Sequence, residues 1–185
     1  MKTVSIEISD LFGRLICICD SDCFPAVDLR GFDLRNANLR GYNFKGANFK
    51  GSNLSCAYLT DIDFNGADLS DANLSGAYLR YSDLRNANLS GANLSGADLS
   101  GSNLSGADLS GSDLRKANLR DAYLNNVNLS CADLSRACLF GAWVKNVNFS
   151  KSILISTNFG HVDLDDADFS DVILSDVVLK KNQNL

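Results

Sequence analysis

Histidine, cysteine and aspartate are the side chains of this chain that could perform acid–base chemistry or bind a metal ion. His161 is the only histidine, and a metal pair or a proton relay built on imidazoles would need a second one. It lies in an acidic stretch, at a position that we predict to face solvent. We therefore expect His161 to be an ordinary surface side chain.

Three cysteines, Cys17, Cys19 and Cys23, lie close together near the N-terminus. Zinc sites commonly use two Cys-x-x-Cys pairs, or cysteines combined with histidines, and this spacing matches neither arrangement. We interpret the three as structural or incidental thiols, with a redox or disulfide role as the alternative.

The glycines and aspartates do not indicate a ligand site either. The glycines recur every five residues and form no phosphate-binding fingerprint. The aspartates lack the nonapeptide period of the calcium-binding β-roll. We expect no cofactor, no metal site and no catalytic residue, and hence no enzymatic activity.

The overall charge limits the kinds of partner. The chain has 185 residues, a net charge of −5 and a sequence pI of about 4.7, which argues against direct nucleic-acid binding because that requires a basic face. The apolar stretch 15–19 is short and follows Arg14, unlike a signal peptide or a membrane span. We expect a cytoplasmic protein with reduced thiols and no membrane association.

A five-residue period organises most of the chain. From Leu29 to Leu179 every fifth residue is Leu or Phe, and Val144 is the one exception. The residue two positions earlier is usually Ala or Ser, and the residue between them is mostly Asn or Asp. The purest copy is Ala-Asn-Leu-Ser-Gly at residues 92–96.

Neither standard element buries every fifth residue. Five residues advance an α-helix by about 140°, which would scatter the leucines around the axis. In a flat strand an odd spacing turns successive leucines to opposite faces. A chain that turns by about 90° at each repeat instead points every Leu inward, and four repeats close a square coil of about 20 residues with Gly, Asn and Asp at the corners.

The tandem Ala-(Asn/Asp)-Leu-x-x pattern over residues 24–181 resembles that of the pentapeptide-repeat proteins. The resemblance implies an all-β fold, a right-handed quadrilateral β-helix of about eight coils spaced by ~4.8 Å. The central Leu or Phe and the small residue two before it would then face inward, and the other three would face solvent. The resemblance also implies a bacterial protein of cyanobacterial type. Residues 182–185 are expected to form a frayed tail.

Residues 1–23 precede the repeats and are expected to form a short cap over the first coil, whose sheet edges would otherwise be exposed. Residues 3–8 alternate like a strand. Residues 9–19 fit two alternatives. Ser9 suits the N-cap of a short amphipathic helix, which is the preferred interpretation, whereas Gly13 and the Cys-Ile-Cys sequence that follows suit a strand.

Aromatic side chains interrupt the polar outer surface at two places. With coils of about 20 residues, Tyr58 and Tyr78 would stack outside one face with Tyr81 nearby, and Tyr123 and Trp143 would stack outside another. Exposed aromatics are effective binding anchors. Stabilising stacking between coils is an equally good explanation, and the sequence leaves both open.

Apolar residues also occupy outward positions near the C-terminus. Ile153, Ile155 and Ile173 share one face, and Phe140 and Val178 share the next, at positions that are mostly polar elsewhere. An exposed apolar patch commonly marks an interface. We predict that it binds a partner protein or a second copy of the chain in a homodimer.

A rigid rod without a catalytic set favours a non-enzymatic scaffold for protein–protein interaction, whose partner the sequence does not identify. The resemblance supplies an alternative, because some pentapeptide-repeat proteins protect DNA gyrase by resembling B-form DNA in width and charge. The acidic composition fits this alternative. The uninterrupted register and the absence of a C-terminal helix signal do not, so the scaffold is the preferred interpretation.

Overall fold

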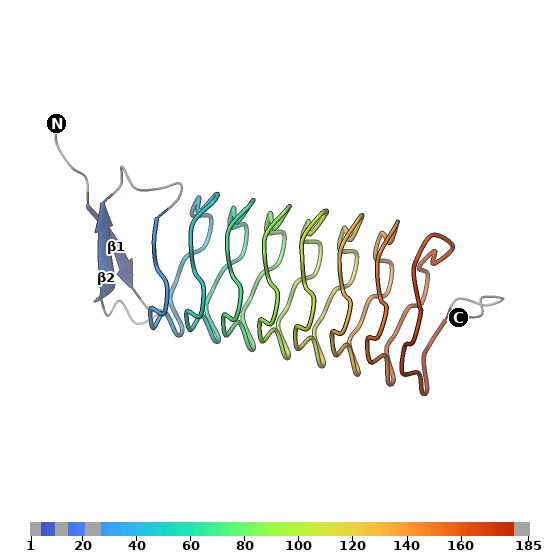
Figure 1. Ribbon diagram of the computed structural model, residues 1–185. Helices are drawn as coiled ribbons and strands as arrows, with labels where there is room; N and C mark the ends of the chain where they lie inside the picture. The colour runs from blue at the N-terminus through green and yellow to red at the C-terminus, as the bar shows by residue number, and fades with distance from the viewer. Residues whose placement is uncertain (1–4, 10–14, 21–26, 180–185) are drawn as a thin grey trace.

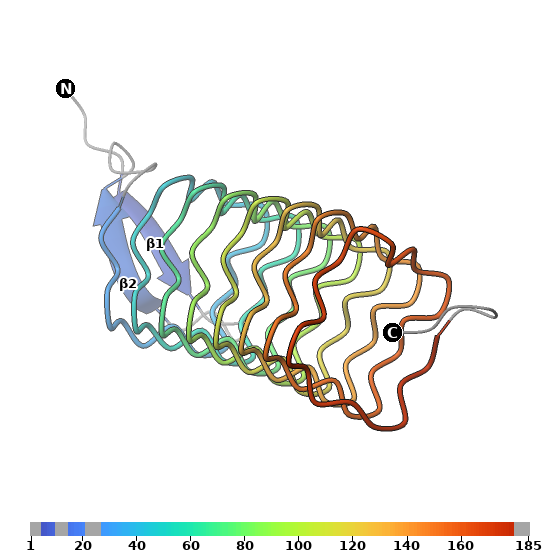
Figure 2. The same cartoon turned by 45° about the vertical axis from the view of Figure 1, so that its right-hand side comes forward.

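Two strands precede a rod of stacked coils. The computed structural model describes residues 5–9, 15–20 and 27–179. Strands β1 (Ser5–Ser9) and β2 (Leu15–Asp20) pair antiparallel as a hairpin, which lies at the N-terminal end of the rod (Figures 1 and 2). Within these three ranges, no helix has the length and apolarity needed to cross a membrane.

The hairpin decides between the two alternatives for the N-terminal segment. The strand predicted for residues 3–8 is confirmed from Ser5 onward. The preferred helix is wrong over residues 15–19, which lie in β2, where Cys17 is paired with Ile8. Pairing with β1 gives hydrogen-bond partners to the main chains of both segments, whereas an isolated helix of this length is marginal in water.

Several sequence predictions fall on the remaining ranges. Residues 24–26 of the predicted repeat segment, the position of Cys23 and the frayed tail predicted at 182–185 all lie outside the described residues.

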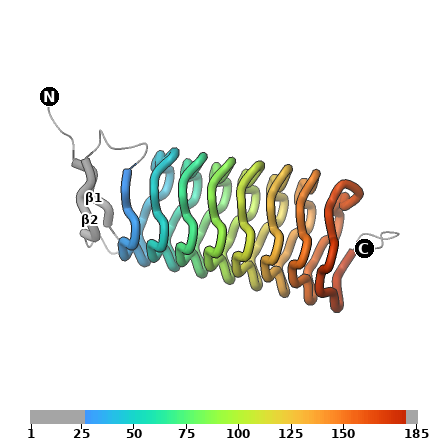
Figure 3. Tube along the Cα trace, in the orientation of Figure 1, coloured from blue at the N-terminus to red at the C-terminus, as the bar shows by residue number. Residues whose placement is uncertain are grey.

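Residues 27–179 wind into coils in which each residue lies beside the one 20 positions later, as in the parallel bridges from Asn73 to Asn93 and from Asn93 to Asp113. The Leu94 N–H donates to the Asp113 carbonyl at 2.7 Å, and the Asp113 N–H donates to the Ala92 carbonyl at 3.0 Å. The expected right-handed quadrilateral β-helix is confirmed, and Figure 3 shows the coils stacked along one axis. Neighbouring coils therefore supply hydrogen-bond partners for each other's main-chain N–H and C=O groups.

Each side of a coil ends in a tight turn that explains the polar repeat positions. In the repeat at residues 92–96, Gly96 has φ of +67°, and the Leu94 carbonyl accepts a hydrogen bond from the Ala97 N–H at 3.0 Å. The Asn93 side-chain oxygen accepts one from the Ser95 N–H at 3.0 Å. The turn therefore favours Gly, Asn or Asp at the corner, although other residues such as Tyr81 also adopt positive φ there, and it favours Asn or Asp before the leucine.

The inward columns form one continuous core. Leu94 and Ala92 are fully buried, as are nearly all other central and small positions along the described rod. In the first coils Phe49 packs edge-on against Phe44 and Phe64, with ring centroids 5.0 and 5.1 Å apart. Close packing of this kind makes the rod rigid.

Serines at the small inward position differ in whether their hydroxyl has a partner. Ser112 donates to the Leu109 carbonyl at 2.7 Å, whereas the buried Ser152 hydroxyl, in the same column two coils later, has none. An unpaired buried hydroxyl costs about 1–3 kcal/mol. We expect Ser152→Ala to raise the free energy of unfolding by about 1 kcal/mol and Ser112→Ala to lower it by about 0.5–1.5 kcal/mol. Urea unfolding of both variants measures the difference, and changes of the same sign would contradict it.

Candidate protein-interaction surfaces

The first aromatic pair stacks as the sequence predicts. Tyr58 and Tyr78 occupy bridged positions of successive coils, with ring centroids 4.8 Å apart and planes inclined by 20°. Tyr81 is exposed at the next corner. Its ring lies against Gly101, where an added Cβ would approach a ring carbon to 2.6 Å, and Arg80 lies 5.3 Å from its centroid. The stacking is confirmed, and a binding role for the tyrosines stays a prediction.

The second aromatic pair lies on another side of the rod. Tyr123 and Trp143 are bridged between successive coils, and their rings are 6.1 Å apart and within 12° of parallel. Trp143 is 62% exposed, so stacking covers only part of the indole. Because Trp143 is more exposed than Tyr123, it is the stronger candidate in this pair for a binding anchor.

The apolar residues near the C-terminus form a surface that we call the C-terminal patch: Ile153, Ile155, Ile173 and Val178. Ile153 and Ile173 are bridged neighbours. Ile155 is 38% exposed, Ile173 55% and Val178 52%, whereas Ile153 is half-buried. The predicted outward orientation is therefore present, and the interface role stays a prediction.

One residue of this end was not predicted from the sequence. Leu174 occupies a central position, which is inward and buried in the middle coils, yet it is 43% exposed. In the middle of the rod the next coil covers each central leucine, and Leu174 lies in the last described coil. Its position near the end of the repeats was the only available signal. Leu174 therefore exposes further apolar area at the C-terminal end of the described rod.

Phe140 is placed differently from the other predicted site residues. Arg120 lies 4.5 Å from its ring centroid, and His161 packs against the ring at a centroid distance of 4.8 Å. A Cβ added to Gly160 would lie only 2.9 Å from the Phe140 ring. The glycine at this position therefore leaves room for the ring. Phe140 is half-buried by these contacts, so we do not include it in the C-terminal patch.

Ion pairs neutralise many of the aspartates along the rod. The Arg85 guanidinium donates to Asp83 through Nε at 2.8 Å, and these hydrogen bonds lower the pKa of Asp83 and raise the pKa of Arg85. Arg115 lowers the pKa of Asp113 in the same way. Such pairs at a surface contribute little to stability, but they reduce the negative charge that a partner would meet.

The described residues offer little for metal or thiol chemistry. No group of three His, Cys, Asp or Glu side chains among them could hold a metal ion. Cys56, Cys131 and Cys138 are free thiols. Cys17 and Cys19 lie in β2, and the structure describes only their main chain.

The geometry defines a class of protein: a tandem-repeat solenoid of four-sided coils, in which the repeated residues build the rod and the departures from the repeat shape its surface. The profile of the family described as pentapeptide repeats matches residues 28–66, 67–106, 102–141 and 145–180. The chain belongs to the pentapeptide-repeat family.

Several solved structures are similar to it. A pentapeptide repeat protein from the thylakoid lumen of Arabidopsis thaliana is 35% identical over 52% of this chain and 68% of its own, with a TM-score of 0.51. HetL, involved in heterocyst differentiation regulation in Nostoc sp. strain PCC 7120, is 30% identical over 84% and 88%, with a TM-score of 0.28. QnrB1, a plasmid-mediated fluoroquinolone resistance protein, is 25% identical over 84% and 83%, with a TM-score of 0.48. No curated protein matches the chain significantly.

Proposed function

We propose that the protein is a non-enzymatic, rigid scaffold that binds a partner protein through the C-terminal patch. Pentapeptide-repeat proteins are generally structural or interaction proteins. The observation that carries the proposal is the exposure of Ile155, Ile173 and Val178 at positions that are polar along most of the rod. Exposed apolar clusters on soluble folds mark interfaces.

Rigidity supports this role. A packed β-helix core does not rearrange when a partner binds, so little conformational entropy is lost on the scaffold side of the complex. The exposed Leu174 adds apolar area at the same end of the rod as the C-terminal patch. A partner that covers both would remove more apolar surface from water than one that covers the patch alone.

Affinity capture tests the proposal. The bait is the full chain, compared with Ile153→Asp/Ile173→Asp, and bound proteins from a host lysate are identified by mass spectrometry. The matched control is Asn73→Asp/Asn93→Asp, which adds the same charge in the same column of earlier coils. We expect the isoleucine variant to lose a partner that the wild type and the control retain. Equal recovery by all three baits would contradict the proposal.

A second copy of the chain is one partner that the C-terminal patch could accept. Light scattering after gel filtration would then give twice 19.9 kDa for the wild type and a monomer for the isoleucine variant. A wild-type monomer at high concentration would leave a different protein as the partner.

The DNA-mimic alternative has less support. A mimic of duplex DNA needs dense, unpaired negative charge along its length, whereas Arg30, Arg35 and Arg115 each pair with a nearby aspartate.

We also propose a cytoplasmic location, in keeping with the free thiols of Cys56 and Cys131.

A further inference from the structure

The parallel ladder between coils is interrupted at one place in the described rod. Bridges join each outward column from coil to coil, but none joins Trp143 to Asp163. Among the described residues, no backbone hydrogen bond connects 142–146 with 161–165. On either side the ladder is intact, since the Gly141 N–H donates to the Gly160 carbonyl at 2.9 Å and the Phe149 N–H to the Asp168 carbonyl at 2.8 Å. One side of the last two coils is therefore open.

The sequence marks the same place. Val144 is the one central residue that is neither Leu nor Phe, and it is half-buried where its counterparts in the middle coils are fully buried. A shorter, β-branched side chain fills less of the core than Leu, so it holds the following coil less closely at this side. The main-chain N–H groups of Val144 and Asp163 have no backbone partner among the described residues.

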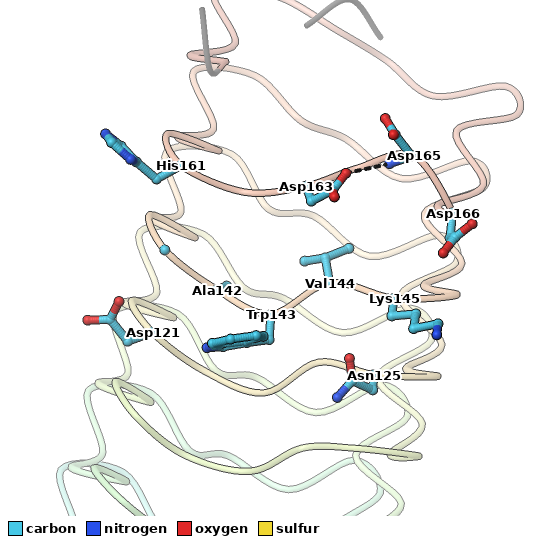
Figure 4. A pocket seen from close by; sticks show the side chains of 11 residues that line it. Asp121, Asn125, Ala142, Trp143, Val144, Lys145, His161, Asp163, Asp165 and Asp166 are labelled. Carbon is cyan, nitrogen blue, oxygen red and sulfur yellow. Dashed lines mark hydrogen bonds between the residues drawn. The ribbon is translucent and has the colours of Figure 1, made fainter.

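A surface cavity of about 590 Å³ occupies the opening and includes Trp143, Val144 and Asp163 in its lining. Figure 4 shows the Trp143 indole projecting from its coil, with Asp121 on the preceding coil and Asp163 on the following one. Tyr123 stacks on one face of the indole. In the following coil the same column holds Asp163 instead of a third aromatic. The second face of the indole is therefore not covered by an aromatic ring from the following coil, and Trp143 lines the cavity.

Negatively charged side chains predominate over positively charged ones in the lining of this cavity. Asp121, Asp163, Asp165 and Asp166 line the cavity, and Lys145 is the one lysine or arginine among the described residues that line it. None of the four aspartates forms an ion pair within the described residues, unlike Asp83 and others earlier along the rod. Among the described residues, Asp163 accepts one hydrogen bond, from the Asp165 N–H at 3.3 Å. Within the part of the chain that the structure describes, these carboxylates have no cationic partner, so an arginine from another protein can pair with them.

We propose that this cavity, the Trp143 cleft, binds an arginine side chain carried by an extended segment of a partner protein. The guanidinium lies on the open indole face, and its planar N–H fork pairs with the carboxylate of Asp163. The main-chain N–H groups of Val144 and Asp163, which have no backbone partner among the described residues, can donate hydrogen bonds to carbonyl groups of the segment. This site lies on a different side of the rod from the C-terminal patch and does not depend on it.

Trp143 is the only tryptophan of the chain, so its fluorescence reports this site alone. The probe is the peptide acetyl-Ser-Val-Arg-Val-Ser-amide, compared with the same peptide carrying neutral citrulline in place of arginine. We expect the arginine peptide to change the Trp143 emission saturably and the citrulline peptide to have no effect. The response should weaken as salt screens the carboxylates.

Two variants distinguish this site from the proposed interface. Asp163→Asn/Asp166→Asn should weaken arginine-peptide binding by at least about tenfold, while Ile153→Asp/Ile173→Asp should leave it unchanged. Thermal melting checks that both variants are folded, and the citrulline comparison on the wild type stands even if one is not. No saturable response to the arginine peptide, or an equal response to citrulline, would overturn the proposal.

Discussion

Leu94→Ala is expected to lower the free energy of unfolding by about 2–5 kcal/mol. Leu94 is fully buried and lies between coils on both sides, to which its main chain is tied through Asn93. The neighbouring inward positions Ala92 and Ala97 are too small to fill the space that the leucine leaves. Each coil is held only by its neighbours, so the cavity weakens both junctions. Urea unfolding followed by circular dichroism measures the loss.

The same substitution at the end of the rod is the matched control. Leu174 occupies the same column as Leu94 but is 43% exposed, so Leu174→Ala removes less buried area and leaves no enclosed cavity. We expect this variant to lose about 1 kcal/mol or less. Equal losses of unfolding free energy at the two positions would contradict the expectation that the cost of removing a leucine depends on its burial.

The repeat made most of the fold predictable, because a period of five specifies which residue of each repeat faces inward. The stacking of Tyr58 on Tyr78 and of Tyr123 on Trp143 followed from the same rule. The rule is local, however, and says nothing about what covers a residue. The exposure of Leu174 depends on whether another coil follows, and the surroundings of Phe140 depend on the side chains of Arg120 and His161 in the neighbouring coils.

The Trp143 cleft shows the same limit. Val144 was visible in the sequence as the one departure from the Leu/Phe column, but a single smaller core residue does not by itself indicate that a ladder opens. The opening appears only when the hydrogen bonds between two particular coils are followed. The helix predicted for the N-terminal segment was wrong for a related reason. The sequence suited helix and strand almost equally there, and pairing with β1 decided between them.

Deleting residues 92–96 is expected to preserve the fold. This removes one complete side of a coil and joins Gly91 to Ala97, so every remaining Leu keeps its five-residue spacing. Each side of the coil has the same inward pattern, so the later coils can continue the stack after a quarter turn about the axis. We expect a cooperative unfolding transition, slightly below that of the wild type because one buried Leu and one buried Ala are lost.

Deleting residues 92–97 removes just one residue more and should be far more damaging. Leu89 and Leu99 would then be four positions apart along the chain instead of five, and a side shortened by one residue cannot span the coil. A one-residue slip in extended chain exchanges the inward and outward faces, so either Asp98 turns into the core or Leu99 leaves it. We expect the six-residue deletion to be at least about 3 kcal/mol less stable than the five-residue one, given the loss of a buried leucine. Parallel urea titrations compare the two, and similar stabilities would mean that the corners absorb a lost residue and that the strict register of this rod is not required for its fold.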